Sequence, residues 1–160
     1  MKEYNKIILA GELLVGAAEA YRSAKTDIDY AKSILMSGAV IGIVHPWLIE
    51  NGIDPSHTQL AKISARIRGI DIASLTKQEQ QNELRRSISF HKLTYNSLKH
   101  AGNKRKNINA ADDLILEANL KEEADYLIGN AIDDYNKLPF SQNMECHQDL
   151  LKLLQSNWAG

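Results

Sequence analysis

Apolar residues recur at helical spacing along most of the chain, with polar residues between them. From about Lys2 to Ser23 they make one broad face, which is the pattern of an amphipathic helix. The members of this face are Ile7, Ile8, Leu13, Leu14, Ala17 and Ala18. The region therefore predicts a first helix that packs against the rest of the protein through this face.

Capping signals mark the second helix. Thr26 followed by Asp29 has the form of a capping box, in which the two side chains satisfy free backbone N–H groups at a helix start. The helix is expected to end near Asn51-Gly52. Pro46 removes a backbone donor inside it and crowds the preceding turn, so we expect a kink there or a split after His45.

Two further helices follow from similar signals. Asp54-Pro55 places a capping residue before a proline, which predicts a third helix that ends at Arg68-Gly69. Thr76 with Glu79 is a second capping box. It predicts one long helix that runs through to about His100.

The last third of the chain begins with an irregular stretch. Leu114-Ile115-Leu116 is expected to form either a short strand or an anchoring turn. Asn119 with Glu122 caps a fifth helix, which Pro139 ends. An amphipathic helix over about residues 143–158 completes the chain. The elements together predict an all-α, up-and-down bundle of five or six helices.

The totals fit one intracellular domain. A chain of 160 residues with 44% hydrophobic content is long enough for a single core, placed here at about residues 2–138. One cysteine, Cys146, cannot form an internal disulfide, which favours a reducing cytosol. The most apolar stretch, residues 34–49, is shorter than the roughly 20 residues of a membrane span. We therefore expect a cytoplasmic protein without membrane contact.

Gly38 and Gly42 are four residues apart in this apolar helix. Each glycine costs a helix about 1 kcal/mol relative to alanine, so the pair indicates a close neighbour. That neighbour is either another helix of the same bundle or a helix from a second copy of the chain.

Charge is distributed unevenly behind a formal net charge of −1. Residues 85–111 contain seven Lys or Arg and no Asp or Glu, whereas residues 112–160 contain three and ten. Such a basic block could neutralise the phosphates of a polyanion. The alternative is that the acidic C-terminal third folds back onto it and cancels its field.

Motifs for metal, phosphate-loop or covalent chemistry are missing from the sequence. It has no H-E-x-x-H or C-x-x-C spacing and no G-x-x-x-x-G-K-[ST] loop. We expect no metal and no cofactor. What remains is the basic segment.

Asn96 and His100 lie one helical turn apart in the predicted long helix, so they can act on the same group. Arg86 falls on the same line but about 21 Å away, which suits an extended strand of nucleic acid and not a small substrate. The rings of Phe90 and Tyr95 offer stacking surfaces for bases, or pack in the core. His100 at a helix end has its own alternative, as a charge that favours the helix dipole.

The segment ELRRSISFHKLTYNSLKHAGN resembles the signature region of HEPN domains, small helical domains associated with nucleotides and RNA in prokaryotic defence systems. Their motif has an Arg, usually followed by a polar residue and often by Asn, with four to six residues between the Arg and a His. Here Asn96, His100 and Gly102 match, with Tyr95 at the place of the Arg, and Arg86 with His91 forms a second partial match. AKSILMSGAVIGIVHPWLIENG and EEADYLIGNAIDDYNKL are also similar to helices of this superfamily, so the resemblance covers about residues 10–138.

The resemblance implies a homodimer whose two motif helices face each other across a cleft. In active members Arg and His cleave RNA without a metal, since histidine moves a proton near neutral pH and arginine holds a phosphate. Tyrosine cannot supply that charge, so cleavage here would require Lys99, Arg86 or a group from the second subunit.

Two functions follow for testing. The first is RNA binding, with metal-independent cleavage as an extension. In it Tyr95, Asn96 and His100 form the catalytic group, and seven residues contact phosphates: Arg85, Arg86, His91, Lys99, Lys104, Arg105 and Lys106. The second is a non-enzymatic homodimeric module, of the accessory or immunity type, whose basic helix binds an acidic protein partner.

Overall fold

The computed structural model describes residues 1–100, 109, 113–139 and 148–158, with the side chains of Phe90 and His91 outside the description. In this part of the chain every regular element is a helix, which confirms the all-α prediction. The described residues contain seven α-helices and one short 3-10 helix. They are α1 (Lys6–Arg22), α2 (Asp27–Glu50), α3 (Ser56–Ile67), η1 (Ile72–Ser74), α4 (Lys77–His91), α5 (Leu93–Lys99), α6 (Leu120–Asn136) and α7 (Gln148–Gln155).

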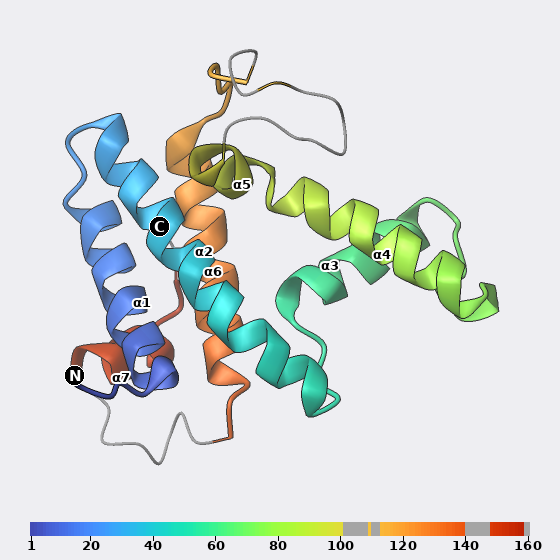
Figure 1. Cartoon of the computed structure of the whole chain (residues 1–160), viewed down its shortest axis with the longest axis horizontal. Coiled ribbons are helices and arrows are strands. Elements are labelled where there is room, and N and C mark those ends of the chain that lie inside the picture. Colours follow the sequence, from blue (N-terminus) through green and yellow to red (C-terminus); the bar gives the residue numbers. More distant parts are fainter. Residues whose placement is uncertain (101–108, 110–112, 140–147, 159–160) are drawn as a thin grey trace.

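Three helices, α1, α2 and α6, lie side by side and enclose the core (Figure 1). Apolar side chains from all three are fully buried between them. Ser33 of α2 adds a polar link, because its hydroxyl donates a hydrogen bond of 2.9 Å to the backbone carbonyl of Ala17 in α1. The short α7 packs across α1 and α6 through Leu150 and Leu153.

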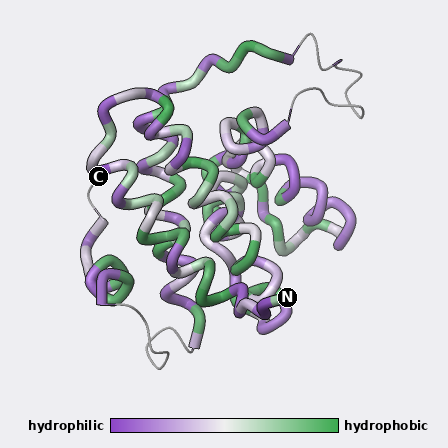
Figure 2. The backbone as a smooth tube through the Cα atoms, turned by 60° about the vertical axis from the view of Figure 1, so that its left-hand side comes forward, coloured by the Kyte–Doolittle hydropathy of each residue, from purple (hydrophilic) through white to green (hydrophobic). Residues whose placement is uncertain are grey.

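The helices α3 and α4 form an arm that projects from this core (Figure 1). They pack mainly against each other. Ala61 and Ala65 of α3 are buried within the arm but do not belong to the core cluster. The polar composition of α4 is visible in Figure 2, where hydrophobic positions concentrate in the central helices.

Three of the four capping predictions are confirmed, and the fourth is wrong: α3 begins at Ser56 with Pro55 at the capping position, so the side chain of Asp54 does not cap it. Asp29 accepts a hydrogen bond of 3.2 Å from the backbone N–H of Thr26 and completes the box that opens α2. Thr76 and Glu79 do the same before α4, with 2.9 Å between the Thr76 nitrogen and the Glu79 carboxylate. Asn119 accepts from the N–H of Glu122 at the start of α6. The helix stops at residues 52 and 69 are also confirmed, because both are glycines with positive φ, 71° and 75°.

Pro46 does not divide its helix. α2 continues from Asp27 to Glu50, so the expected split after His45 is wrong. The free backbone carbonyl of Gly42, four residues before the proline, lies on an exposed part of the helix. Solvent can therefore hydrogen-bond this group, which removes most of the cost of the missing intrahelical bond.

The long basic helix, in contrast, is interrupted. Residue Lys92 leaves helical geometry, with φ −111° and ψ 13°, so α4 and α5 are separate helices. The prediction that Arg86 and His100 lie along one line of a single helix is therefore wrong. This break also raises the number of helices above the expected five or six.

The stretch before α6 has no regular structure between residues 113 and 119, so the short strand is wrong. An anchoring turn is not seen either, because Leu114 and Ile115 are largely exposed. The last helix occupies Gln148–Gln155, the middle of the predicted range, and residues 140–147 lie outside the described part.

Candidate functional site

The predicted site residues of α5 divide between surface and core. The side chains of Asn96, Lys99 and His100 are exposed. His100 closes α5, and its backbone N–H donates to the Asn96 carbonyl at 3.0 Å. The amide and the imidazole therefore remain at the end of one helix with access to solvent.

Tyr95 instead packs inward. Its ring is half-buried against the core and lies over the backbone of Gly38 in α2. The ammonium group of Lys99 lies 5.6 Å from the ring centroid. For this ring the structure matches core packing, the alternative to base stacking, and Gly38 contacts a helix of its own bundle.

Three described cations of the basic segment are open to solvent. Arg85, Arg86 and Lys99 are exposed, and no residue in the described part of the chain forms an ion pair with them. Arg68 on the neighbouring helix is different, since its guanidinium pairs with Glu83. The remaining predicted contacts fall outside the described residues, namely Lys104, Arg105, Lys106 and the side chain of His91.

The described acidic residues of the C-terminal third do not cover this segment. α6 packs on α1 and α2, and α7 packs on α1 and α6. One cation is an exception. Lys92, at the break between α4 and α5, is half-buried and close enough to Asp134 to feel its charge.

Asp134 is the centre of a second cluster, which sequence reasoning missed. Its carboxylate is completely buried where α2, α3 and α6 meet. Oδ2 lies 2.6 Å from Nε2 of His45 in α2. Oδ1 accepts 2.6 Å hydrogen bonds from the backbone N–H and the hydroxyl of Ser56, the first residue of α3.

Lys137 completes the cluster. Its ammonium group lies 2.7 Å from a carboxylate oxygen of Asp133 and 3.2 Å from Oδ1 of Asp134. It also donates to the Ser56 hydroxyl at 3.1 Å. The ring of His57, fully buried, packs edge-on against the His45 ring with centroids 5.6 Å apart.

These contacts change the acidity of the carboxylate. Burial acts to raise the pKa of Asp134, but the hydrogen bonds from His45 and Ser56 outweigh burial and hold it at about 2, against a usual value of 3.8. Burial lowers the pKa of Lys92, and the charge of Asp134 opposes that effect. The cluster therefore holds an ionised buried carboxylate at neutral pH.

This cluster positions α3 on the core and does not activate Ser56 as a nucleophile. A serine nucleophile needs a base that takes its proton. The Ser56 hydroxyl donates to a carboxylate, and His45 binds that same carboxylate and not the serine. The ammonium group of Lys137 is held by two carboxylates and donates to the Ser56 hydroxyl. The cluster fastens the arm to the core.

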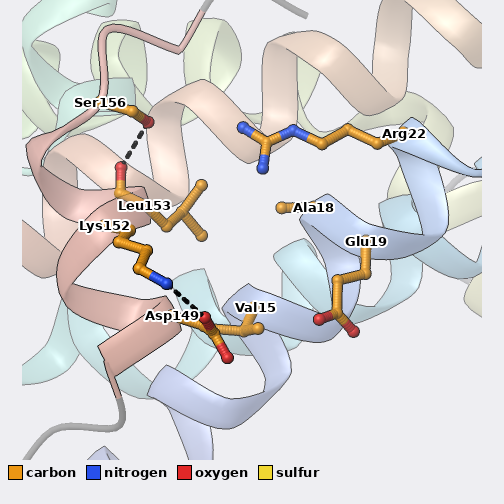
Figure 3. A pocket seen from close by; sticks show the side chains of 8 residues that line it. All are labelled: Val15, Ala18, Glu19, Arg22, Asp149, Lys152, Leu153 and Ser156. Atoms are coloured by element: carbon orange, nitrogen blue, oxygen red, sulfur yellow. Dashed lines mark hydrogen bonds and ion pairs between the residues drawn. The ribbon is translucent and has the colours of Figure 1, made fainter.

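Two surface grooves lie away from both places. One, of about 310 Å³, runs between α1 and α7 and is lined by two acidic and two basic side chains, Glu19, Arg22, Asp149 and Lys152 (Figure 3). The other, of about 640 Å³, lies beside η1. Neither contains a predicted site residue.

Comparison with known proteins gives no match: no family model fits the sequence, and no curated protein or solved structure is significantly similar. No group of three or more potential metal ligands occurs among the described residues. Of the helices described, α2 alone has the length and hydropathy of a membrane span, and 44% of its most apolar window is buried within the protein.

Proposed function

We propose that the chain binds RNA through a basic surface formed by the exposed side chains of Arg85, Arg86, Lys99 and His100, with the amide of Asn96 among them. The observation that carries this proposal is that Arg85, Arg86 and Lys99 are exposed without an ion pair to any described residue. A cation that already has a carboxylate partner must break that pair to bind a phosphate. These three need not.

The bend at Lys92 determines which kind of ligand suits the surface. Two cations lie on α4 before the bend, whereas Lys99 and His100 lie on α5 after it. A single strand is flexible enough to follow a change of direction, and its phosphates can meet both groups of cations. Asn96 and His100 can donate and accept hydrogen bonds at exposed base edges, which single-stranded RNA offers.

The proposal concerns binding and not cleavage. Tyr95 stands where the motif of HEPN domains has its arginine, and its ring lies against Gly38. It therefore brings no positive charge to the imidazole of His100. RNA recovered after incubation with the protein should be intact.

A salt titration tests the proposal. Binding of a fluorescent single-stranded RNA is measured between low and high salt for the wild type and for the double variant Arg85→Gln/Arg86→Gln. Each phosphate contact contributes about 0.7 to the slope of log K against log salt for a single strand. The variant should bind more weakly at low salt, with a slope smaller by about 1.4.

A matched control removes two exposed charges elsewhere. Lys6→Gln/Lys25→Gln lowers the net charge by the same amount, and both positions lie outside the basic segment. The control should keep the wild-type slope. Binding that is independent of salt, or equal losses in both double variants, would refute the proposal. Absence of RNA affinity together with stable capture of an acidic protein would favour the interaction module.

A further inference from the structure

One face of α2 is apolar, exposed and spaced for contact with another helix. The residues on it follow each other at intervals of four and three, the spacing of a coiled-coil seam. Three large side chains on this seam are exposed, at 64% for Ile28, 39% for Leu35 and 62% for Ile49. The whole seam consists of Ile28, Lys32, Leu35, Ala39, Gly42, Pro46 and Ile49.

The opposite faces of α2 are already occupied by α1, α5 and α6. On the seam, however, a Cβ added at Gly42 would meet no atom within 4 Å. From residue 33 to residue 49 the helix has no Asp, Glu, Lys or Arg. A solvent-facing stripe of this length without a charge is unusual for a helix that has no further partner.

We propose that the seam binds the seam of a second copy of this chain, with the two α2 helices antiparallel. In that arrangement Ala39 of each copy lies opposite Gly42 of the other, at the centre of the interface. Leu35 lies opposite Pro46, and Lys32 opposite Ile49. Small residues at the centre allow the backbones to approach closely, while the larger ones fill the space on both sides.

The charges at the two ends select this orientation. Lys32 lies near the start of the helix and Glu50 at its end, both exposed and on the same side as the seam. An antiparallel pair brings Lys32 of each copy to Glu50 of the other, whereas a parallel pair places like charges together. Lys32 already contacts Asp29 at 3.1 Å but keeps 58% of its side chain exposed, so donors remain for a second carboxylate.

The size of the seam predicts a weak association. A helix of 24 residues is about 36 Å long. With a contact width of about 10 Å its footprint is about 360 Å², less than half of the roughly 800 Å² per partner in a standard stable interface. The dimer should therefore dissociate on dilution.

A twofold axis has a further geometric consequence. The axis of an antiparallel pair is perpendicular to the plane of the two helices, so equivalent flanks of both copies face the same side. α5 packs on the flank that contains Gly38, next to the seam. Both α5 helices would therefore lie on one side of the dimer.

Charge reversal with rescue tests this interface. Sedimentation equilibrium would give the dimer dissociation constant of the wild type, Lys32→Glu, Glu50→Lys and the double variant Lys32→Glu/Glu50→Lys. Each single variant replaces two attractions by two repulsions and should raise the constant about tenfold. The double variant restores both pairs and should return it to within about twofold of the wild type.

Independent evidence comes from the apolar part and from lipid. Leu35→Glu places a charge in the seam at an exposed position, so the chain should fold normally, as circular dichroism can verify, and remain monomeric. A wild type that is monomeric at every concentration, or a double variant no better than the single ones, overturns the proposal. The proposal is also overturned if the wild type is a monomer that floats with vesicles of neutral phospholipid and the Leu35→Glu variant does not. That result would assign the seam to a membrane.

Discussion

The ring of Tyr95 lies so close to Gly38 that a methyl group on that glycine would come within 2.2 Å of it. This contact joins α5 to α2 and determines where the exposed end of α5 is presented. Because the helix has only seven residues, one such contact is a large part of what holds it. The glycine is therefore needed for the position of Asn96 and His100, although it is distant from them in sequence.

Gly38→Ala should displace α5. The ring is rigid and cannot turn away as a flexible side chain would, so the helix has to move, at a cost of about 1–3 kcal/mol in the free energy of unfolding. Urea denaturation measures this cost. Affinity for RNA should fall as well if the basic surface binds it.

Gly42→Ala is the matched control in the same helix. An added Cβ meets nothing there, so the substitution should stabilise the monomer by up to about 1 kcal/mol through helix propensity alone. Both variants should be measured at low protein concentration. Equal effects at the two positions would mean that the Tyr95 contact does not matter.

Asp134 should contribute to stability against acid. Its pKa is about 2 in the folded protein against 3.8 as a usual value, so the unfolded chain takes up the proton first as the pH falls. The contribution is therefore complete above about pH 4 and is lost as the pH falls through about 2, and it amounts to about 2 kcal/mol.

Asp134→Asn should lose this amount at neutral pH and depend less on pH in the acid range. Denaturation followed from pH 7 to pH 2 measures both quantities. Glu12→Gln removes an exposed carboxylate from α1 and should retain the wild-type acid profile. An unchanged profile in Asp134→Asn would show that the buried carboxylate is not the group responsible.

The charge of Lys92 should lower the stability of the fold, whereas the charge of Asp134 raises it. Burial lowers its pKa from the usual 10.5, so the folded protein releases this proton before the unfolded chain does. Its charge costs stability at neutral pH, and the cost disappears as the pH rises toward 10. Lys92→Met should therefore be at least as stable as the wild type at pH 7, and the difference should shrink at alkaline pH. Lys121→Met, at an exposed position on α6, gives the comparison.

Trp158 should hold the end of the chain to the core. Its indole N–H donates to Asp125 at 2.6 Å, its ring meets Tyr21 edge-on at 5.6 Å, and the Arg22 guanidinium lies 5.1 Å from the ring. Trp158→Ala should cost about 2 kcal/mol, less than for a fully buried tryptophan. Trp158→Phe keeps the ring contacts but not the hydrogen bond and should cost about 1 kcal/mol. Equal losses in the two variants would place the whole effect in the hydrogen bond.

Local signals in the sequence were good guides to the helices. The boxes at Thr26 and Thr76 and the glycines at 52 and 69 involve neighbours within a few residues, so they can be read without the fold. The exposure of Asn96, Lys99 and His100 also agrees with a surface site, although their use remains a prediction.

Long-range contacts explain what the sequence could not provide. Asp54 was the predicted cap of α3, but the helix starts at Ser56, whose backbone N–H donates to Asp134 from another helix. The break at Lys92 has a similar origin, because α4 packs on α3 while α5 packs on α2. The only sequence trace of the cluster is the spacing of Asp133 and Asp134 to Lys137, which is common on ordinary helix surfaces.

The arm of α3 and α4 meets the core at Ser56, whose backbone N–H and hydroxyl donate hydrogen bonds to Asp134, while Ala61 and Ala65 are buried within the arm. Separating the arm from the core would hydrate the charged groups around Asp134 and would expose little apolar surface. The arm can consequently swing as a unit at a fraction of the energy of global unfolding. A protease that cuts near residues 52–55 under mild conditions would detect this hinge while the three-helix core is still intact.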